Sequence, residues 1–208
     1  MRNVFSGNTY NGYDLSNSEK NNQGFYAEIL QAIGSLFDSM IKRHGKVFFT
    51  MFVLKYPAGS AMEYPNDNRL MSRFIEALTL YYKRKMVDPK YLWVREVSTT
   101  GQVHYHLTLL LNGDLTQNAH GILRKATELW QGCLGIENGN GLVHLCTRDE
   151  ECAQYGGIKI VRNALDFNQV LNKCYMLASY FAKCYSKDGF PRYVNGFGSS
   201  RLPQINPA

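Results

Sequence analysis

Residues 91–111, YLWVREVSTTGQVHYHLTLLL, contain two runs of β-branched, aromatic and aliphatic residues separated by a short polar turn. Such runs favour β-strands, and the turn at 99–101 has the length and the final glycine of a three-residue hairpin loop. We therefore expect two antiparallel strands over 91–98 and 102–111. The other elements must pack around this hairpin, so it decides the fold.

Two histidines, His104 and His106, alternate with Tyr105 in the second strand. Alternate residues of a strand project to one face of its sheet, so the two imidazoles share a face and Tyr105 points to the other. A three-residue loop sets the register that places Glu96 opposite His104 and diagonal to His106. A two-residue loop would instead place Tyr105 opposite Glu96 and separate the three polar side chains.

Two imidazoles and one carboxylate on a shared face form a ligand set for a divalent cation, with positions left open for water or substrate. These ligand types suit Mg²⁺, Mn²⁺ or Zn²⁺, and the residues alone do not select among them. The alternative is a pair of histidines that only forms hydrogen bonds on the sheet surface. The expected register of Glu96 favours the metal site.

Apolar residues at helical spacing predict helices around the hairpin. The expected helices cover residues 25–43, 68–86, 116–133 and 166–187, and further strands cover 46–55 and 143–146. Hairpins and helices mix without strict alternation, which favours an α+β domain with a central, mainly antiparallel β-sheet flanked by helices. Residues 1–22, rich in Asn, Ser and Gly, predict an irregular N-terminal arm, and 23–208 predict a single domain with a Gly/Pro/Ser-rich tail.

Composition excludes several classes of protein. The 208 residues include 23 Lys and Arg against 17 Asp and Glu, and the net charge of +6 is compatible with a nucleic-acid partner. No apolar run approaches the roughly 18 residues that span a bilayer, and the N-terminus has no apolar signal core. The five cysteines include no CxxC pair, so we expect neither a disulfide framework nor a zinc knuckle, and a reducing cytoplasm as the compartment.

The last expected helix contains Tyr175, Tyr180 and Tyr185. At about 100° per residue, Tyr175 and Tyr185 fall on the apolar stripe, whereas Tyr180 falls opposite it with Lys183 one turn away. Packing explains the first two tyrosines and leaves Tyr180 as the single candidate nucleophile. A phenol beside a cation can attack phosphorus that a metal polarises, whereas the alternative is an ordinary exposed tyrosine.

Basic residues near aromatic side chains are candidate contacts to single-stranded nucleic acid. One group follows Tyr81 and Tyr82 at the end of the second expected helix, where cations also favour the helix dipole. The other group lies in the C-terminal tail. The candidates are Lys83, Arg84, Lys85, Arg192 and Arg201.

The order of these motifs resembles the HUH endonucleases, the rolling-circle replication initiators and relaxases. The motifs are the strand FFTMFVL at 48–54, Glu96 eight residues before His104-Tyr-His106, and the later Tyr180-Phe-Ala-Lys183. Within this superfamily the chain is most similar to the inovirus replication-protein-like group, which includes the YagK/YfjJ C-terminal domains.

The resemblance covers roughly residues 25–202, and the tail GFGSSR at 196–201 is typical of the same group. Tyr105 departs from the pattern, since an aliphatic residue is more usual between the two histidines. The resemblance implies an HUH/Rep-type sheet, similar to ferredoxin-like and RNA-recognition-motif folds, with a metal on its central strands.

The resemblance also implies the roles of the site residues. His104 and His106 would bind Mg²⁺ or Mn²⁺ with Glu96 as the third ligand. Tyr180 would attack the scissile phosphodiester of single-stranded DNA at a replication origin, which leaves a 5′-phosphotyrosine link and a free 3′-hydroxyl. Lys183 would orient or neutralise the phosphate.

The implied function is site-specific nicking and rejoining of DNA, which initiates rolling-circle replication of a phage, prophage or satellite element in the cytoplasm of a bacterial host. The chain has no room for a motor domain, so unwinding is expected from a host helicase and the host replication machinery. The alternatives are a single-tyrosine HUH transposase and a non-catalytic DNA-binding regulator on the same fold. A metal-independent phosphodiesterase with two His-x-Thr strands fits poorly, because His144-Leu-Cys146 lacks the second hydroxyl.

Overall fold

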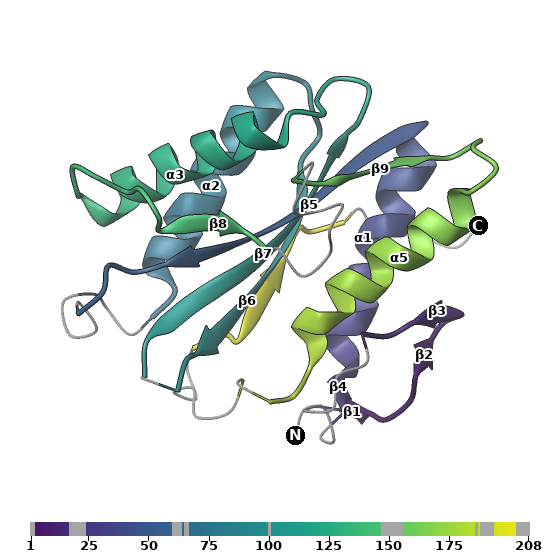
Figure 1. Ribbon diagram of the computed structural model, residues 1–208, viewed down its shortest axis with the longest axis horizontal. Helices are drawn as coiled ribbons and strands as arrows, with labels where there is room; N and C mark the ends of the chain where they lie inside the picture. The colour runs from purple at the N-terminus through teal and green to yellow at the C-terminus, as the bar shows by residue number, and fades with distance from the viewer. Residues whose placement is uncertain are drawn as a thin grey trace.

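The computed structural model (Figure 1) describes residues 3–16, 24–59, 64, 67–99, 101–146, 156–185, 187 and 194–202. In chain order the elements are β1 (Val4–Phe5), β2 (Thr9–Tyr10), β3 (Tyr13–Asp14), β4 (Phe25–Tyr26), α1 (Ala27–Arg43), β5 (Lys46–Lys55), α2 (Arg69–Arg84), β6 (Lys90–Val97), β7 (Val103–Asn112), α3 (Ala119–Leu134), β8 (Val143–Leu145), β9 (Ile158–Val161), α5 (Phe167–Ser179), the 3-10 turn η1 (Tyr180–Ala182) and β10 (Phe197–Ser199).

A six-stranded sheet forms the centre of the molecule. Its order is β10-β6-β7-β5-β8, and β9 also pairs with β5. β8 pairs with β5 over Phe52–Leu54 and β9 pairs with it over Lys46–Phe49, so the two short strands share one edge of β5. The pairings between these described strands are antiparallel, which confirms the α+β class with a central antiparallel sheet.

Different helices cover the two faces of the sheet. Figure 1 shows α2 and α3 on one face and α1 and α5 on the other. Strand alternation separates the two cores: Tyr105 and Leu107 of β7 pack among α2 and α3 residues, whereas Leu110 packs among α1 and α5 residues. The same alternation directs His104 and His106 to the α1–α5 face.

The structure corrects two expectations at the N-terminus. Residues 3–16, expected to be irregular, contain three two-residue strands, in which β1 pairs with β4 and β2 pairs with β3. The first long helix begins at Ala27 instead of residue 25, because Phe25 and Tyr26 pair with β1. None of the helices among the described residues is long and apolar enough to cross a membrane.

β10 depends on a glycine at its centre. Gly198 lies opposite Trp93 of β6, and a Cβ atom at this position would lie 2.7–2.8 Å from three atoms of the indole. Real Cβ atoms do not approach this closely, so a larger residue would push β10 away from β6.

We expect Gly198→Ala to lower the free energy of unfolding by about 1–3 kcal/mol, the usual cost of overpacking. The control is Gly45→Ala, because a Cβ atom there meets nothing within 4 Å, and its effect should stay within about 0.5 kcal/mol. Urea denaturation of both variants measures the difference. Equal stability of the two variants would show that β10 tolerates the extra methyl group.

Candidate metal centre

The β6–β7 hairpin sets the register of the candidate ligands. Ser98 N donates to Gln102 O at 2.9 Å, and Gly101 N donates to Ser98 O at 2.9 Å. Gly101 has φ +80°, a conformation that glycine adopts without steric cost. The predicted three-residue loop is confirmed, and so is the pairing of Glu96 with His104.

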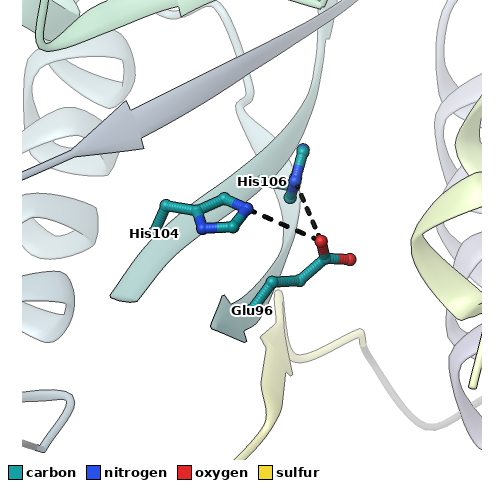
Figure 2. A group of neighbouring side chains, drawn as sticks. All are labelled: Glu96, His104 and His106. Atoms are coloured by element: carbon teal, nitrogen blue, oxygen red, sulfur yellow. Dashed lines mark ion pairs between the residues drawn. The ribbon is translucent and has the colours of Figure 1, made fainter. Parts of the chain in front are cut away.

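Glu96, His104 and His106 converge on the α1–α5 face of the sheet (Figure 2). Oε2 of Glu96 lies 3.3 Å from Nε2 of His106 and 3.6 Å from Nε2 of His104. One ligand atom from each residue lies within 4.8 Å of the other two. Ligand atoms that share one ion at about 2.1 Å lie within about 4.2 Å of each other, so small side-chain shifts would let these three hold a divalent cation.

The electrostatics of the cluster favour its metal-binding forms. Burial alone would raise the pKa of Glu96, but the hydrogen bonds from His104 and His106 and the charge of Lys187 outweigh it and hold this pKa well below its ordinary value. Burial lowers the pKa of His106, and the Glu96 carboxylate offsets this only in part. A carboxylate and a neutral imidazole are the protonation states that bind a metal ion.

Metal binding at Nε2 of His106 would require its ring proton to reside on Nδ1, because a ligating nitrogen presents its lone pair. Nδ1 of His106 lies 4.0 Å from Sγ of Cys146, a weak acceptor beside β8. The cysteine is therefore placed to face the protonated nitrogen and to help to orient the ring.

Lys187 is a component of the site that the sequence did not reveal. Its ammonium donates to Oε1 of Glu96 at 2.8 Å, and its side chain is only 1% exposed. The two oxygens of Glu96 thus divide their roles: Oε1 accepts from Lys187, and Oε2 faces the histidines. Lys187 stands 91 residues after Glu96, and no local pattern connects them.

The tyrosine segment departs from the predicted helix over 166–187. α5 ends at Ser179, whose hydroxyl accepts from Ser16 N at 2.8 Å and donates to Met176 O at 2.7 Å. Tyr180 begins the short 3-10 turn, and Lys183 then leaves the helix in an extended conformation to form a bridge with Phe25 of β4.

This early helix end changes the relation between the tyrosines. Tyr175 is buried and donates to Leu30 O at 3.0 Å, which confirms that it packs in the core. The prediction for Tyr185 is wrong, because its hydroxyl lies 2.6 Å from the hydroxyl of Tyr180 instead of on the opposite side of a helix. The ring of Tyr180 lies 6.4 Å from the ring of His106, so two phenols, not one, lie beside the histidine cluster.

Lys183 lies close to Tyr180, but in a different way from that expected. It is buried, with 1% of its surface exposed, and its ammonium lies 4.4 Å from the centre of the Tyr180 ring. The cation therefore stacks on the phenol ring in a cation–π contact, and does not lie on an exposed helix face.

The candidate DNA-binding residues occupy different surroundings. Lys83 and Arg201 line a common groove, and Arg84 is exposed at the end of α2. The ammonium of Lys85 lies 4.6 Å from the centre of the Tyr81 ring. Tyr82 is buried, so its ring is not available for base stacking, and Arg192 lies outside the described residues.

The fold and the cluster define an α+β domain that carries a Glu-His-His group on its central strands. Residues 7–200 match the model of the YagK/YfjJ C-terminal domain. The chain belongs to this family, and the match begins inside the segment that composition alone assigns to an irregular arm.

Comparison with curated proteins finds no match to this chain. Among solved structures, the N-terminal nuclease domain of non-structural protein 1 from minute virus of mice is similar over 87% of this chain and 76% of that chain. The two are 13% identical with a TM-score of 0.30, and that domain is described as coordinating Zn²⁺ in its active-site pocket and as recognising DNA at the origin of replication. The fold assignment rests on the chain's own sheet and helices.

The cluster predicts direct metal binding. We expect the wild-type protein to bind Mn²⁺, and Glu96→Gln and His104→Gln each to weaken that binding by roughly 100-fold or more, since changes outside the ligand shell alone cost about 10–100-fold. Isothermal titration measures these affinities. His120→Gln, an exposed α3 variant remote from the cluster, is the control and should match the wild type. Equal affinities in the variants of Glu96 and His104 would exclude the site.

The stability of the metal-free protein should depend on pH through His106. Burial lowers the pKa of His106 in the folded chain from its ordinary value of 6.5, so the unfolded chain takes up this proton first. The free energy of unfolding should therefore fall as the pH decreases below about 6.5. Urea denaturation in EDTA at a series of pH values measures this fall, which should be smaller in His106→Gln. An identical pH dependence in both proteins would contradict the assignment.

Proposed function

We propose that the protein is a metal-dependent endonuclease that nicks and rejoins single-stranded DNA through a covalent phosphotyrosine. The observation that carries this proposal is the position of the Tyr180 ring, 6.4 Å from the ring of His106 in a cluster of potential metal ligands. A metal site beside a nucleophilic phenol suits transfer of a phosphoryl group from DNA to tyrosine.

Glu96, His104 and His106 are the residues that would hold the cation. When bound there, a divalent ion would act as a Lewis acid on the scissile phosphodiester. The oxygen of Tyr180 forms a bond to phosphorus, the bond from phosphorus to the 3′-oxygen breaks, and the proton lost by the phenol ends on that 3′-oxygen. The 5′-phosphotyrosine conserves the bond energy, so attack by a 3′-hydroxyl can reverse the step and rejoin the strand.

Tyr185 and the two buried lysines support the reaction of Tyr180. The hydroxyl of Tyr185, 2.6 Å from that of Tyr180, can donate a hydrogen bond to the phenol oxygen as negative charge develops on it. The ammonium of Lys183 over the ring and that of Lys187 beside Glu96 add positive charge near the place where the phosphate would bind.

The biological role that we propose is the initiation of rolling-circle replication of a phage, prophage or satellite element. The motif order shared with the replication initiators supports it, and the chain's family membership is compatible with it. The partners would be origin DNA, a host helicase and the replication machinery in the cytoplasm of a bacterial host, with Mg²⁺ or Mn²⁺ as the metal. Arg84, Lys85 and Arg192 remain proposed contacts to this DNA.

A covalent-adduct assay tests the proposal. Incubation with labelled single-stranded origin DNA and Mn²⁺ should produce a protein–DNA adduct on a denaturing gel, and EDTA should abolish it. Tyr180→Phe should remove the adduct, because the nucleophilic oxygen is absent. Tyr185→Phe should slow its formation by roughly 10–150-fold, since hydrogen bonds to charged groups contribute about 1.5–3 kcal/mol.

Tyr175→Phe is the matched control for a buried phenol outside the cluster, and it should form the adduct at the wild-type rate. An adduct that survives in Tyr180→Phe and disappears in Tyr185→Phe would reverse the assignment of the nucleophile. Cleavage without any adduct would exclude the phosphotyrosine mechanism, and DNA binding without cleavage would indicate a regulator.

A further inference from the structure

A groove of about 560 Å³ lies between α2, the first part of β6 and the two residues that follow β10, Ser200 and Arg201. It is on the α2–α3 face of the sheet, because Trp93 in its wall packs with residues of that core. The Glu-His-His cluster is on the opposite face: Glu96 stands three residues after Trp93 on β6, and an odd separation reverses the direction of the side chain. The groove is therefore distinct from the metal centre.

The two walls of the groove each contribute an exposed cation. Lys83 comes from α2, and Arg201 follows β10. Neither joins an ion pair with another residue in the part of the chain that the structure describes. The third cation in the wall, Lys90, is held by Asp88 at 2.7 Å, and Glu76 is the one carboxylate among the lining residues. The groove thus presents net positive charge through Lys83 and Arg201.

Aromatic and apolar side chains line the same groove as these cations. Tyr91 is half-buried beside Arg201, whose charge opposes the effect of burial on the tyrosine pKa. Ile75 and Leu80 of α2 line the facing wall, and Leu80 is 47% exposed. A groove that combines an aromatic ring, aliphatic walls and two cations offers contacts to both the bases and the phosphates of an unpaired strand.

We propose that this groove binds a segment of single-stranded DNA, with phosphates at Lys83 and Arg201 and a base against Tyr91. The choice of DNA as the ligand rests on the proposed function. A duplex keeps its bases stacked inside and would leave the apolar walls and Tyr91 without a partner, so the unpaired strand fits better.

The position of the groove decides which part of the DNA it would hold. Trp93 and Glu96 lie about 10 Å apart along β6 and on opposite faces, and β10 forms the sheet edge beside them. The β10 edge offers a route by which a strand in the groove would reach the cluster. The groove binds nucleotides that flank the nick and contributes to affinity, whereas Tyr180 acts on the scissile phosphate.

Fluorescence anisotropy with labelled oligothymidylate, in EDTA, tests the groove without the metal. The double variant Lys83→Gln/Arg201→Gln should bind tenfold or more weakly at low salt. Each phosphate contact to a single strand contributes about 0.7 to the slope of log affinity against log salt. Loss of two contacts should therefore reduce the magnitude of this slope by about 1.4. Lys42→Gln/Lys159→Gln, which removes two exposed cations elsewhere, should retain affinity and slope. Affinity within twofold of wild type in the groove variant would overturn the proposal.

Photocross-linking locates the strand independently of any loss of stability. An oligonucleotide that contains bromodeoxyuridine should cross-link to the peptide with Tyr91, and the yield should fall in the groove variant. Cross-links confined to peptides of the α1–α5 face would also overturn the proposal. The adduct assay separates the two proposals. Adduct formation without a groove cross-link would exclude only DNA binding in the groove. Binding in the groove without an adduct would exclude only the nuclease activity.

Discussion

The register of the β6–β7 hairpin is the constraint on which the candidate site depends. Gly101, with φ +80°, closes a three-residue loop that places Glu96 opposite His104. Side chains alternate along a strand, so a shift of one residue would turn Tyr105 toward α1 and α5 and bury the histidines under α2 and α3. Tyr105 instead packs 5.8 Å from the ring of Trp93 in the opposite core. Burial of that aromatic pair thereby stabilises the register that the metal ligands need.

Charge compensation connects this hairpin to a distant part of the chain. A buried carboxylate is costly unless it is paired, and Glu96 is paired by Lys187 on one oxygen and by the histidines on the other. A second buried cation, Lys183, lies over the Tyr180 ring. Because Lys187 is paired with Glu96, Lys183 gives these groups a net positive charge, which suits a phosphodiester and the phenol that we propose attacks it. The groove on the other face also carries positive charge, through the exposed side chains of Lys83 and Arg201.

Local rules were sufficient for the hairpin and insufficient for the tyrosine segment. The period of two along a strand and the length of one loop predicted the shared face of His104 and His106 and the position of Glu96. The helical periodicity of residues 166–187 continues past Ser179, so it predicted one uninterrupted helix. The real end depends on Ser16 and Phe25, which contact Ser179 and Lys183 from more than 150 residues away. Tyr185 was misplaced for this reason, whereas Lys187 was missed because no local pattern connects it with Glu96, 91 residues earlier.

The sequence by itself determined the α+β class, the antiparallel hairpin and the three potential metal ligands, because short-range sterics and strand alternation decide each of them. Only the tertiary structure decided where α5 ends, and with it the contact between Tyr180 and Tyr185 and the pairing of Lys187 with Glu96. It alone also brought Lys83 and Arg201 to one groove. These contacts join segments far apart in the chain, and their energies are comparable to the local helix preferences that they override.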